Sequence, residues 1–233
     1  MRRLTPGRVL VRYTKAVPAD GSDSFEAYAA AHGLTLEPGE RLPRTTPLLA
    51  TGELRGVDAV ASGWLATYVE ARLAVVERAE GRFTVALTHV PKAKRFVPWL
   101  LCHRAEDEGL LGDAARRLIG GGERIDLESV ELDRDYRIYA ASERDDVWLH
   151  ELFSPQFIVF LIERAPAGFA FEYAEGSLCV SLVGSRTLAA DLDALREATV
   201  DLVGRFRAEI RERLGEARGR SAPAPPGWPA QDG

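Results

Sequence analysis

The stretch from residue 169 to residue 214 decides the fold: it begins FAFEYAEGSLCVSLV (169–183) and continues GSRTLAADLDALREATVDLVGRFRAEIRERL (184–214). In its first part, apolar residues alternate with other residues on both sides of Glu175 and Gly176. This pattern is typical of a β-hairpin closed by a tight turn. The predicted inner face of the hairpin consists of Phe169, Phe171, Tyr173, Leu178, Val180 and Leu182.

The second part of the stretch has the period of an amphipathic helix. Its large side chains recur at spacings of three and four residues, which places them on one helical face. They are Leu188, Leu192, Leu195, Thr199, Leu202, Phe206, Ile210 and Leu214. Because the opposite face is strongly charged, we predict one long helix over residues 188–214 that packs along a sheet or against a partner helix.

The same two patterns predict the elements that precede the hairpin. Alternating apolar residues indicate strands at residues 8–13, 68–76, 83–90, 97–103, 125–132 and 136–141. A turn at Glu80 and Gly81 joins two of these strands, and residues 34–47 are expected to form a loop that leads into a strand. Helices are expected at residues 25–32, 113–119, 145–153 and 155–164. The last of these is apolar nearly all round, which predicts that it is buried.

These elements predict an α+β fold. An antiparallel β-sheet of six to eight strands is expected to be covered by the long C-terminal helix and the buried central helix. Residues 1–217 are predicted to form a single domain, and residues 218–233 a disordered tail rich in Pro and Ala. The run Gly120-Gly121-Gly122 is an alternative hinge between two halves, but the strands on either side are too few for two independent sheets.

Composition limits the classes of partner. The chain has 233 residues, a net charge of −5 and a pI near 5.5, which argues against non-specific nucleic-acid binding. The short basic cluster of Lys92, Lys94 and Arg95 is interpreted as a solvated turn, with a binding patch as the alternative. No apolar run is long enough to span a membrane, and the N-terminus lacks a signal core, so we expect a soluble, cytoplasmic protein without membrane insertion.

No catalytic, metal or cofactor motif stands out, and no cofactor is expected. The four histidines (His32, His89, His103 and His150) lack zinc-binding spacing. A metal site assembled from His89, Cys102 and Glu128 is an alternative to ordinary core and rim residues. Cys102 and Cys179 lie in apolar runs, which favours two buried thiols, although a single bridge stays open.

Two further groups of residues are interpreted as structural. The acidic residues between positions 128 and 146 lack the spacing of a calcium loop and are assigned to strand ends and helix caps. They are Glu128, Glu131, Asp133, Asp135, Glu143, Asp145 and Asp146. Gly184 and Ser185 precede the long helix, where a cap is favoured over an anion site.

Several phrases resemble a bacterial family of unknown function, the domain-of-unknown-function family numbered 3137. They are LESVELDRDYRIY at residues 127–139, LFSPQF at residues 152–157 and the hairpin from Phe169 to Val180. Upstream phrases at residues 42–49 and 83–91 are similar to actinobacterial hypothetical proteins. The resemblance covers about 90 residues well, implies an uncharacterised fold and implies no activity. Many members of that family have membrane helices near the N-terminus, whereas this sequence shows none. The resemblance therefore does not imply a membrane-associated role.

Three hypotheses about function follow. The first is a non-catalytic interaction or scaffolding module with an exposed apolar patch, a protein partner or a homodimer, and a Pro-rich tail that a partner recognises. The second is a small-molecule or lipid-binding module with a cavity of roughly a few hundred Å³ between sheet and long helix. That cavity would be lined by Leu195, Leu202 and Phe206 and by Phe169, Phe171 and Tyr173, unless these residues simply fill the core. The third, less favoured, is an enzyme whose site is assembled from His89, His103 and Glu128.

Overall fold

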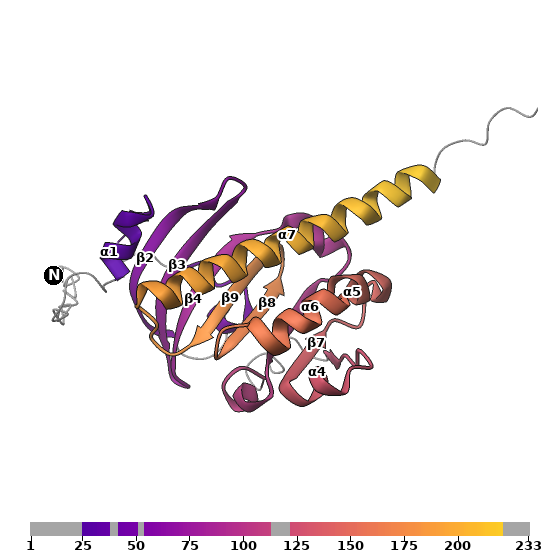
Figure 1. The fold of residues 1–233 in the computed structure, drawn as a ribbon, viewed down its shortest axis with the longest axis horizontal. Coiled ribbons are helices and arrows are strands. Elements are labelled where there is room, and N and C mark those ends of the chain that lie inside the picture. The colour runs from indigo at the N-terminus through magenta and orange to yellow at the C-terminus, as the bar shows by residue number, and fades with distance from the viewer. Residues whose placement is uncertain (1–24, 38–41, 51–53, 113–121, 221–233) are drawn as a thin grey trace, which may run out of the picture.

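A single antiparallel sheet organises the molecule. The computed structural model describes residues 25–37, 42–50, 54–112 and 122–220. Within them, nine strands follow the spatial order β1-β2-β3-β4-β9-β8-β5-β7-β6 (Figure 1). The strands are β1 (Thr35–Leu36), β2 (Leu54–Ala66), β3 (Val69–Arg78), β4 (Arg82–His89), β5 (Trp99–Arg104), β6 (Glu123–Arg124), β7 (Tyr136–Ala140), β8 (Phe169–Ala174) and β9 (Ser177–Val183).

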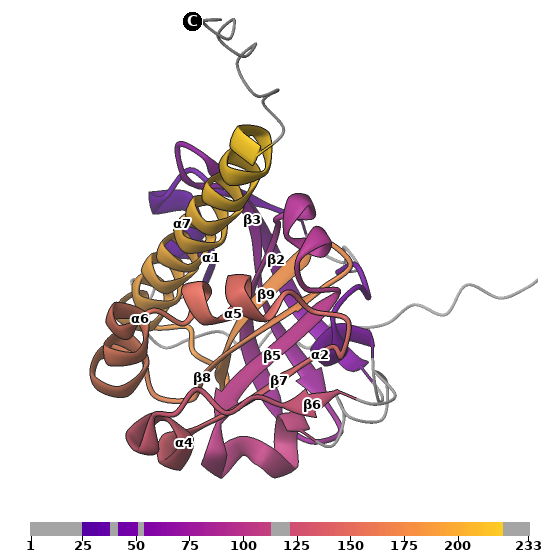
Figure 2. The ribbon, with the colours of Figure 1, turned by 90° about the vertical axis from the view of Figure 1, so that its right-hand side faces the viewer.

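Helices flank the sheet. They are α1 (Phe25–Ala31), α2 (Pro47–Ala50), α4 (Val130–Asp135), α5 (Asp146–Leu152), α6 (Pro155–Val159) and α7 (Ala189–Arg220). Two short 3-10 helices, η1 (Pro91–Arg95) and η2 (Ala105–Asp107), and two π-helical turns, η3 (Glu108–Gly112) and η4 (Phe160–Arg164), complete the described elements. Figure 2 shows α5, α6 and α7 on one side of the sheet and α2 on the other. The predicted α+β class is confirmed, and the sheet has nine described strands instead of six to eight.

The predicted hairpin forms as β8 and β9. Phe171 pairs with Val180, and the register is continuous from one end of the hairpin to the other. The turn residues Glu175 and Gly176 have φ values of 51° and 89°. Two positive φ values are typical of a type I′ turn, whose twist matches that of the strands it joins. The turn at Glu175 and Gly176 is therefore confirmed.

The first face of the sheet carries the large side chains. Phe169, Phe171 and Tyr173 lie in the same core as Leu195, Leu202 and Phe206 of α7, and all six are at most 1% exposed. The helices α1, α5 and α6 add their apolar residues to this core. Fully burying side chains of this size gives about 1.5–3 kcal/mol each, which explains why α7 stays on this face.

The second face is covered by smaller elements. Leu48 and Leu49 of α2 pack there with Val85, Ala170 and Cys179. The prediction that residues 34–47 form a loop leading into a strand is wrong at both ends, because Thr35–Leu36 form β1 and Pro47–Ala50 form one helical turn. Pro47 fits this turn, since proline suits the first position of a helix.

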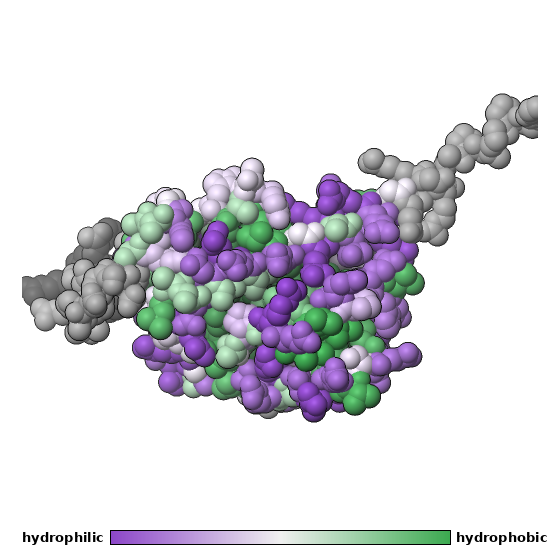
Figure 3. All heavy atoms as spheres, in the orientation of Figure 1, coloured by the Kyte–Doolittle hydropathy of each residue, from purple (hydrophilic) through white to green (hydrophobic). Residues whose placement is uncertain are grey.

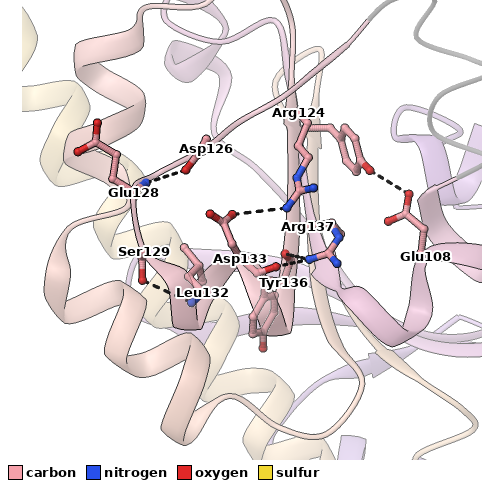
Figure 4. A network of polar contacts seen from close by, with 10 residues as sticks. Glu108, Arg124, Asp126, Glu128, Ser129, Leu132, Asp133, Tyr136 and Arg137 are labelled. Atoms are coloured by element: carbon pink, nitrogen blue, oxygen red, sulfur yellow. Dashed lines mark hydrogen bonds and ion pairs between the residues drawn. The ribbon is translucent and has the colours of Figure 1, made fainter.

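Three further features of the structure differ from the predictions. The 13-residue strand β2 was not predicted, because Gly56 and Gly63 interrupt its pattern and its pairing with β3 contains register shifts. Residues 125–132 do not form a strand, since Ser129 caps α4 by accepting the Leu132 N–H at 3.4 Å (Figure 4). The central helix is buried on one side only, and Val159 on its outer side is 46% exposed.

Some predictions lie outside the described residues. They are the strand at residues 8–13, the helix at residues 113–119 and most of the tail. α7 runs to Arg220, which is beyond the predicted end of the folded domain at residue 217. Strands from both sides of the Gly120-Gly121-Gly122 run belong to the same sheet.

Candidate functional site

An open groove of about 670 Å³ lies between the C-terminal half of α7 and the segment where β4 continues into η1. Its apolar lining consists of Val90, Pro91, Ile210 and Leu214. Its polar lining consists of Tyr68, His89, Lys92, Arg207 and Arg211, and Gly204 completes it. In Figure 3, apolar surface lies beside the tip of the β2–β3 hairpin, and hydrophilic side chains border it along α7.

Local structure explains why these residues meet. Gly204, Arg207, Arg211 and Leu214 have helical spacings of three and four residues, so they share one face of α7. On the other wall, the Val90 N–H donates to Gly176 O at 2.8 Å. The Tyr173 hydroxyl also donates to Val90 O, at 3.2 Å. The hairpin turn therefore holds the wall of the groove in place.

The polar lining of the groove is cationic. Arg207 donates to Tyr68 O at 2.7 Å, and its guanidinium lies 5.4 Å from the centre of the Tyr68 ring. The Arg211 Nε donates to Arg207 O at 3.2 Å. Considering the described residues alone, neither arginine forms an ion pair, nor does Lys92. The groove thus combines an apolar floor with positive charge.

The six residues proposed as the lining of a cavity between sheet and helix fill the core instead, which was the alternative interpretation. The rings of Tyr173 and Phe206 pack with centroids 5.6 Å apart, and Trp148 packs edge-on against Phe206 at 5.5 Å. Aromatic rings therefore occupy the space where the cavity was predicted. The groove lies on another part of the same helix surface, lined by Gly204, Arg207, Ile210, Arg211 and Leu214.

The histidines do not converge on one site. His89 lies at the end of β4. Through β9 and β8 its position is in register with Trp99 of β5, which is three strands away. His103 lies four residues further along β5. With about 4.8 Å per strand and about 3.3 Å per residue, the two backbones are roughly 20 Å apart. Glu128 lies in the turn before α4, with φ 57°. The site predicted from His89, His103 and Glu128 is therefore not assembled.

His103 belongs instead to a small buried polar cluster. Its Nδ1 lies 2.8 Å from Arg104 O, and its Nε2 lies 3.3 Å from a carboxylate oxygen of Glu108. The Tyr139 hydroxyl donates to the other oxygen of Glu108 at 2.9 Å. Across the described part of the chain, no three His, Cys, Asp or Glu side chains are grouped as metal ligands would be.

The two cysteines are separate, buried thiols. Cys102 belongs to the core on the first face and Cys179 to the core on the second, so the sheet lies between them. Both thiols are free. Burial raises the pKa of each thiol well above its usual value, which leaves little of the reactive thiolate. The prediction of structural cysteines fits this geometry, and a bridge between them is excluded.

Most of the predicted acidic residues have arginine partners. Figure 4 shows the Asp133 carboxylate directed toward Arg124, at 3.7 Å. Asp145 accepts the Trp148 N–H at the start of α5 and two hydrogen bonds from Arg213 of α7, at 3.1 and 3.0 Å. These contacts support the interpretation as caps and ion pairs. Gly184 and Ser185 lie in the turn after β9, before α7 begins at Ala189.

One buried charged cluster was not predicted. Glu172 points to the second face and is 4% exposed, and its carboxylate accepts the Leu48 N–H of α2 at 2.7 Å. Arg78, which is 2% exposed, donates to Leu48 O. Burial raises the pKa of Glu172 to about 7, partly offset by the Leu48 N–H and the Arg78 charge. The sequence signal for this cluster is Glu172 itself, because a carboxylate between Phe171 and Tyr173 in an otherwise apolar strand indicates a buried charge.

Comparisons with known proteins support the fold. No protein-family model matches this chain, and no curated protein sequence matches it either. Its structure is similar to the crystal structure of the mycobacterial trehalose monomycolate transport factor A, TtfA, with a TM-score of 0.51 and 14% sequence identity. The match covers 81% of this chain and 93% of the other. In the described residues, no helix has the length and apolar character needed to cross a membrane.

Proposed function

We propose that this protein is a non-catalytic binding module whose groove holds the acyl chain of an amphiphilic, lipid-like molecule. The observation that carries the proposal is the groove beside α7, with Val90, Ile210 and Leu214 on its apolar side. Its volume of about 670 Å³ falls within the range of roughly 300–1,000 Å³ that is common for small-molecule sites. The scattered histidines and buried thiols favour binding over catalysis.

The fold gives a second line of support. The similar structure is that of a protein named as a transport factor for trehalose monomycolate. A fold alone does not specify a ligand, so the groove remains the main argument. We also propose that the chain belongs to the family numbered 3137, which residues 127–139, 152–157 and 169–180 resemble.

The test is native mass spectrometry of the full chain with monolauroylglycerol, an uncharged amphiphile, alongside a denaturing control. We expect one bound molecule, which is lost on denaturation. Leu214→Glu places a charge in the apolar lining and should abolish binding. Leu188→Glu is the matched control, because Leu188 is 54% exposed and is not part of the lining. Equal binding by the two variants would overturn the assignment to the groove.

A second candidate is the interaction module, favoured by one observation. Val159 of α6 is 46% exposed, and Ile158 and Ile162 beside it are half-buried. Figure 3 shows an apolar area over α6. If this area mediates self-association, the mass measured by light scattering will rise with protein concentration, and Val159→Lys will suppress the rise. A constant mass for both proteins would contradict self-association.

A further inference from the structure

We infer that the ligand of the groove carries an anionic head group, a phosphate or a carboxylate, bound by Arg207, Arg211 and Lys92. This inference rests on the proposed function and specifies the chemistry of its ligand. In this arrangement the chain of the ligand lies along Val90, Ile210 and Leu214, while its head group lies at the cationic side of the same groove.

The positions of the cations support this assignment. Arg207 and Arg211 are four residues apart on α7, so they lie on the same helical face, and Lys92 approaches from η1 on the opposite wall. Like charges at this helical spacing repel each other. An anion placed between the two walls would replace this repulsion with attraction to both.

The arginines are also oriented before any ligand binds. Arg207 is held by Tyr68 through a hydrogen bond and a ring contact, and Arg211 is held by Arg207 O. Each guanidinium uses one nitrogen in these bonds with described residues, so further N–H groups are left for a ligand. Guanidinium groups bind phosphate and carboxylate oxygens through paired hydrogen bonds, which are among the stronger ones in proteins.

The charge of the groove contrasts with that of the rest of the chain. The chain has a net charge of −5, yet three cations and no carboxylate line the groove. Cations next to it are paired: Lys94 with Glu175, and Arg213 with Asp145. Within the described ranges, cations without an ion-pair partner thus line a groove whose apolar floor suits an acyl chain. This complementarity of charge and surface favours an anionic amphiphile over an uncharged one.

The experiment is isothermal titration calorimetry of the full chain at fixed salt concentration with matched probes. Dodecyl phosphate and laurate carry an anionic head, monolauroylglycerol carries a neutral head, and inorganic phosphate has no chain. Because hydrogen bonds to charged groups are stronger than those between neutral groups, we expect dodecyl phosphate to bind at least about tenfold more tightly than monolauroylglycerol. Inorganic phosphate should bind far more weakly than dodecyl phosphate.

Two matched pairs of variants locate the effect. Arg211→Gln should weaken dodecyl phosphate binding about tenfold and leave monolauroylglycerol binding unchanged. Arg205→Gln removes the same charge from α7, but Arg205 stacks over Phe157 and is not part of the groove, so both affinities should stay. Lys92→Gln and Lys94→Gln form the second pair, with only the first expected to weaken binding of the anion.

The outcomes separate the two proposals. Equal affinity for dodecyl phosphate and monolauroylglycerol, unchanged by Arg211→Gln, overturns the anionic head group and leaves the acyl-chain groove standing. Inorganic phosphate that binds as tightly as dodecyl phosphate supports the anion site and overturns the acyl-chain groove. If none of the four probes binds, both proposals are overturned.

Discussion

The two faces of the sheet are covered in different ways. On the first face, the 32-residue helix α7 rests on aromatic side chains such as Phe171 and Tyr173. On the second, the four-residue helix α2 is held partly by the buried carboxylate of Glu172, which accepts the Leu48 N–H. A helix of one turn is too short to be stable alone or to bury much apolar surface. The comparison indicates that a long amphipathic helix is held by packing, whereas a single turn needs a polar contact.

The largest expected effect tests packing on the first face. Phe206→Ala removes a ring that is fully buried against Trp148 and Tyr173, so we expect the free energy of unfolding to fall by about 3–5 kcal/mol. Urea denaturation followed by circular dichroism measures it. Glu197→Ala on the exposed side of α7 is the control and should change stability by less than about 0.5 kcal/mol. Similar losses for both variants would contradict the role assigned to packing.

The next effect tests the buried carboxylate on the second face. The pKa of Glu172 is raised from 4.5 to about 7, so the folded state favours the protonated form. Its contribution to stability is fully present below about pH 4.5 and is lost as the pH rises to about 7. The expected loss in this window is on the order of 1.4 kcal/mol per pH unit. Glu172→Gln keeps an acceptor for the Leu48 N–H and should remove this slope.

The measurement for Glu172 is a series of urea denaturation curves between pH 4.5 and 8. The difference between wild type and Glu172→Gln isolates the slope from other groups that titrate in this range. Glu175→Gln, at the exposed turn of the same hairpin, should follow the wild-type curve. Parallel curves for wild type and Glu172→Gln would show that the second face does not depend on the ionisation of Glu172.

The smallest effect tests whether the first face also has a polar contact at its edge. Asp145 caps α5 and binds Arg213 of α7, so Asp145→Ala should lower the free energy of unfolding by about 1–2 kcal/mol. Asp146→Ala is the matched control, since Asp146 is exposed and its pair with Arg144 contributes little. Equal effects of the two substitutions would mean that the bond between Asp145 and Arg213 adds nothing.

The first face could be predicted from the sequence because its signals are periodic. Large apolar side chains alternate along the hairpin, and α7 repeats them over seven turns. Each pattern therefore predicts both the element and the apolar face with which it packs. The second face could not be predicted in the same way. Gly56 and Gly63 disrupt the pattern of β2, and α2 is too short to show a period. Ser129 was a missed signal, because a serine followed by acidic residues often begins a helix.

The candidate groove was beyond prediction for a related reason. The cluster of Lys92, Lys94 and Arg95 reads as a basic turn in the sequence, but Arg207 and Arg211 are ordinary residues of a charged helix surface. Only the fold brings Lys92 and Arg211 to the same groove. Separations of more than a hundred residues leave no local pattern, so nothing in the sequence indicates that these residues line a common groove.

The burial of one cysteine on each face has a practical consequence for following motions of the protein. Cys102 lies in the core on the first face and Cys179 in the core on the second, and the chain contains no other cysteine. A thiol reagent can modify either residue only when the layer above it opens. The modification rates of the two thiols, measured separately by peptide mass mapping, therefore report how often each face of the sheet opens in the wild-type protein.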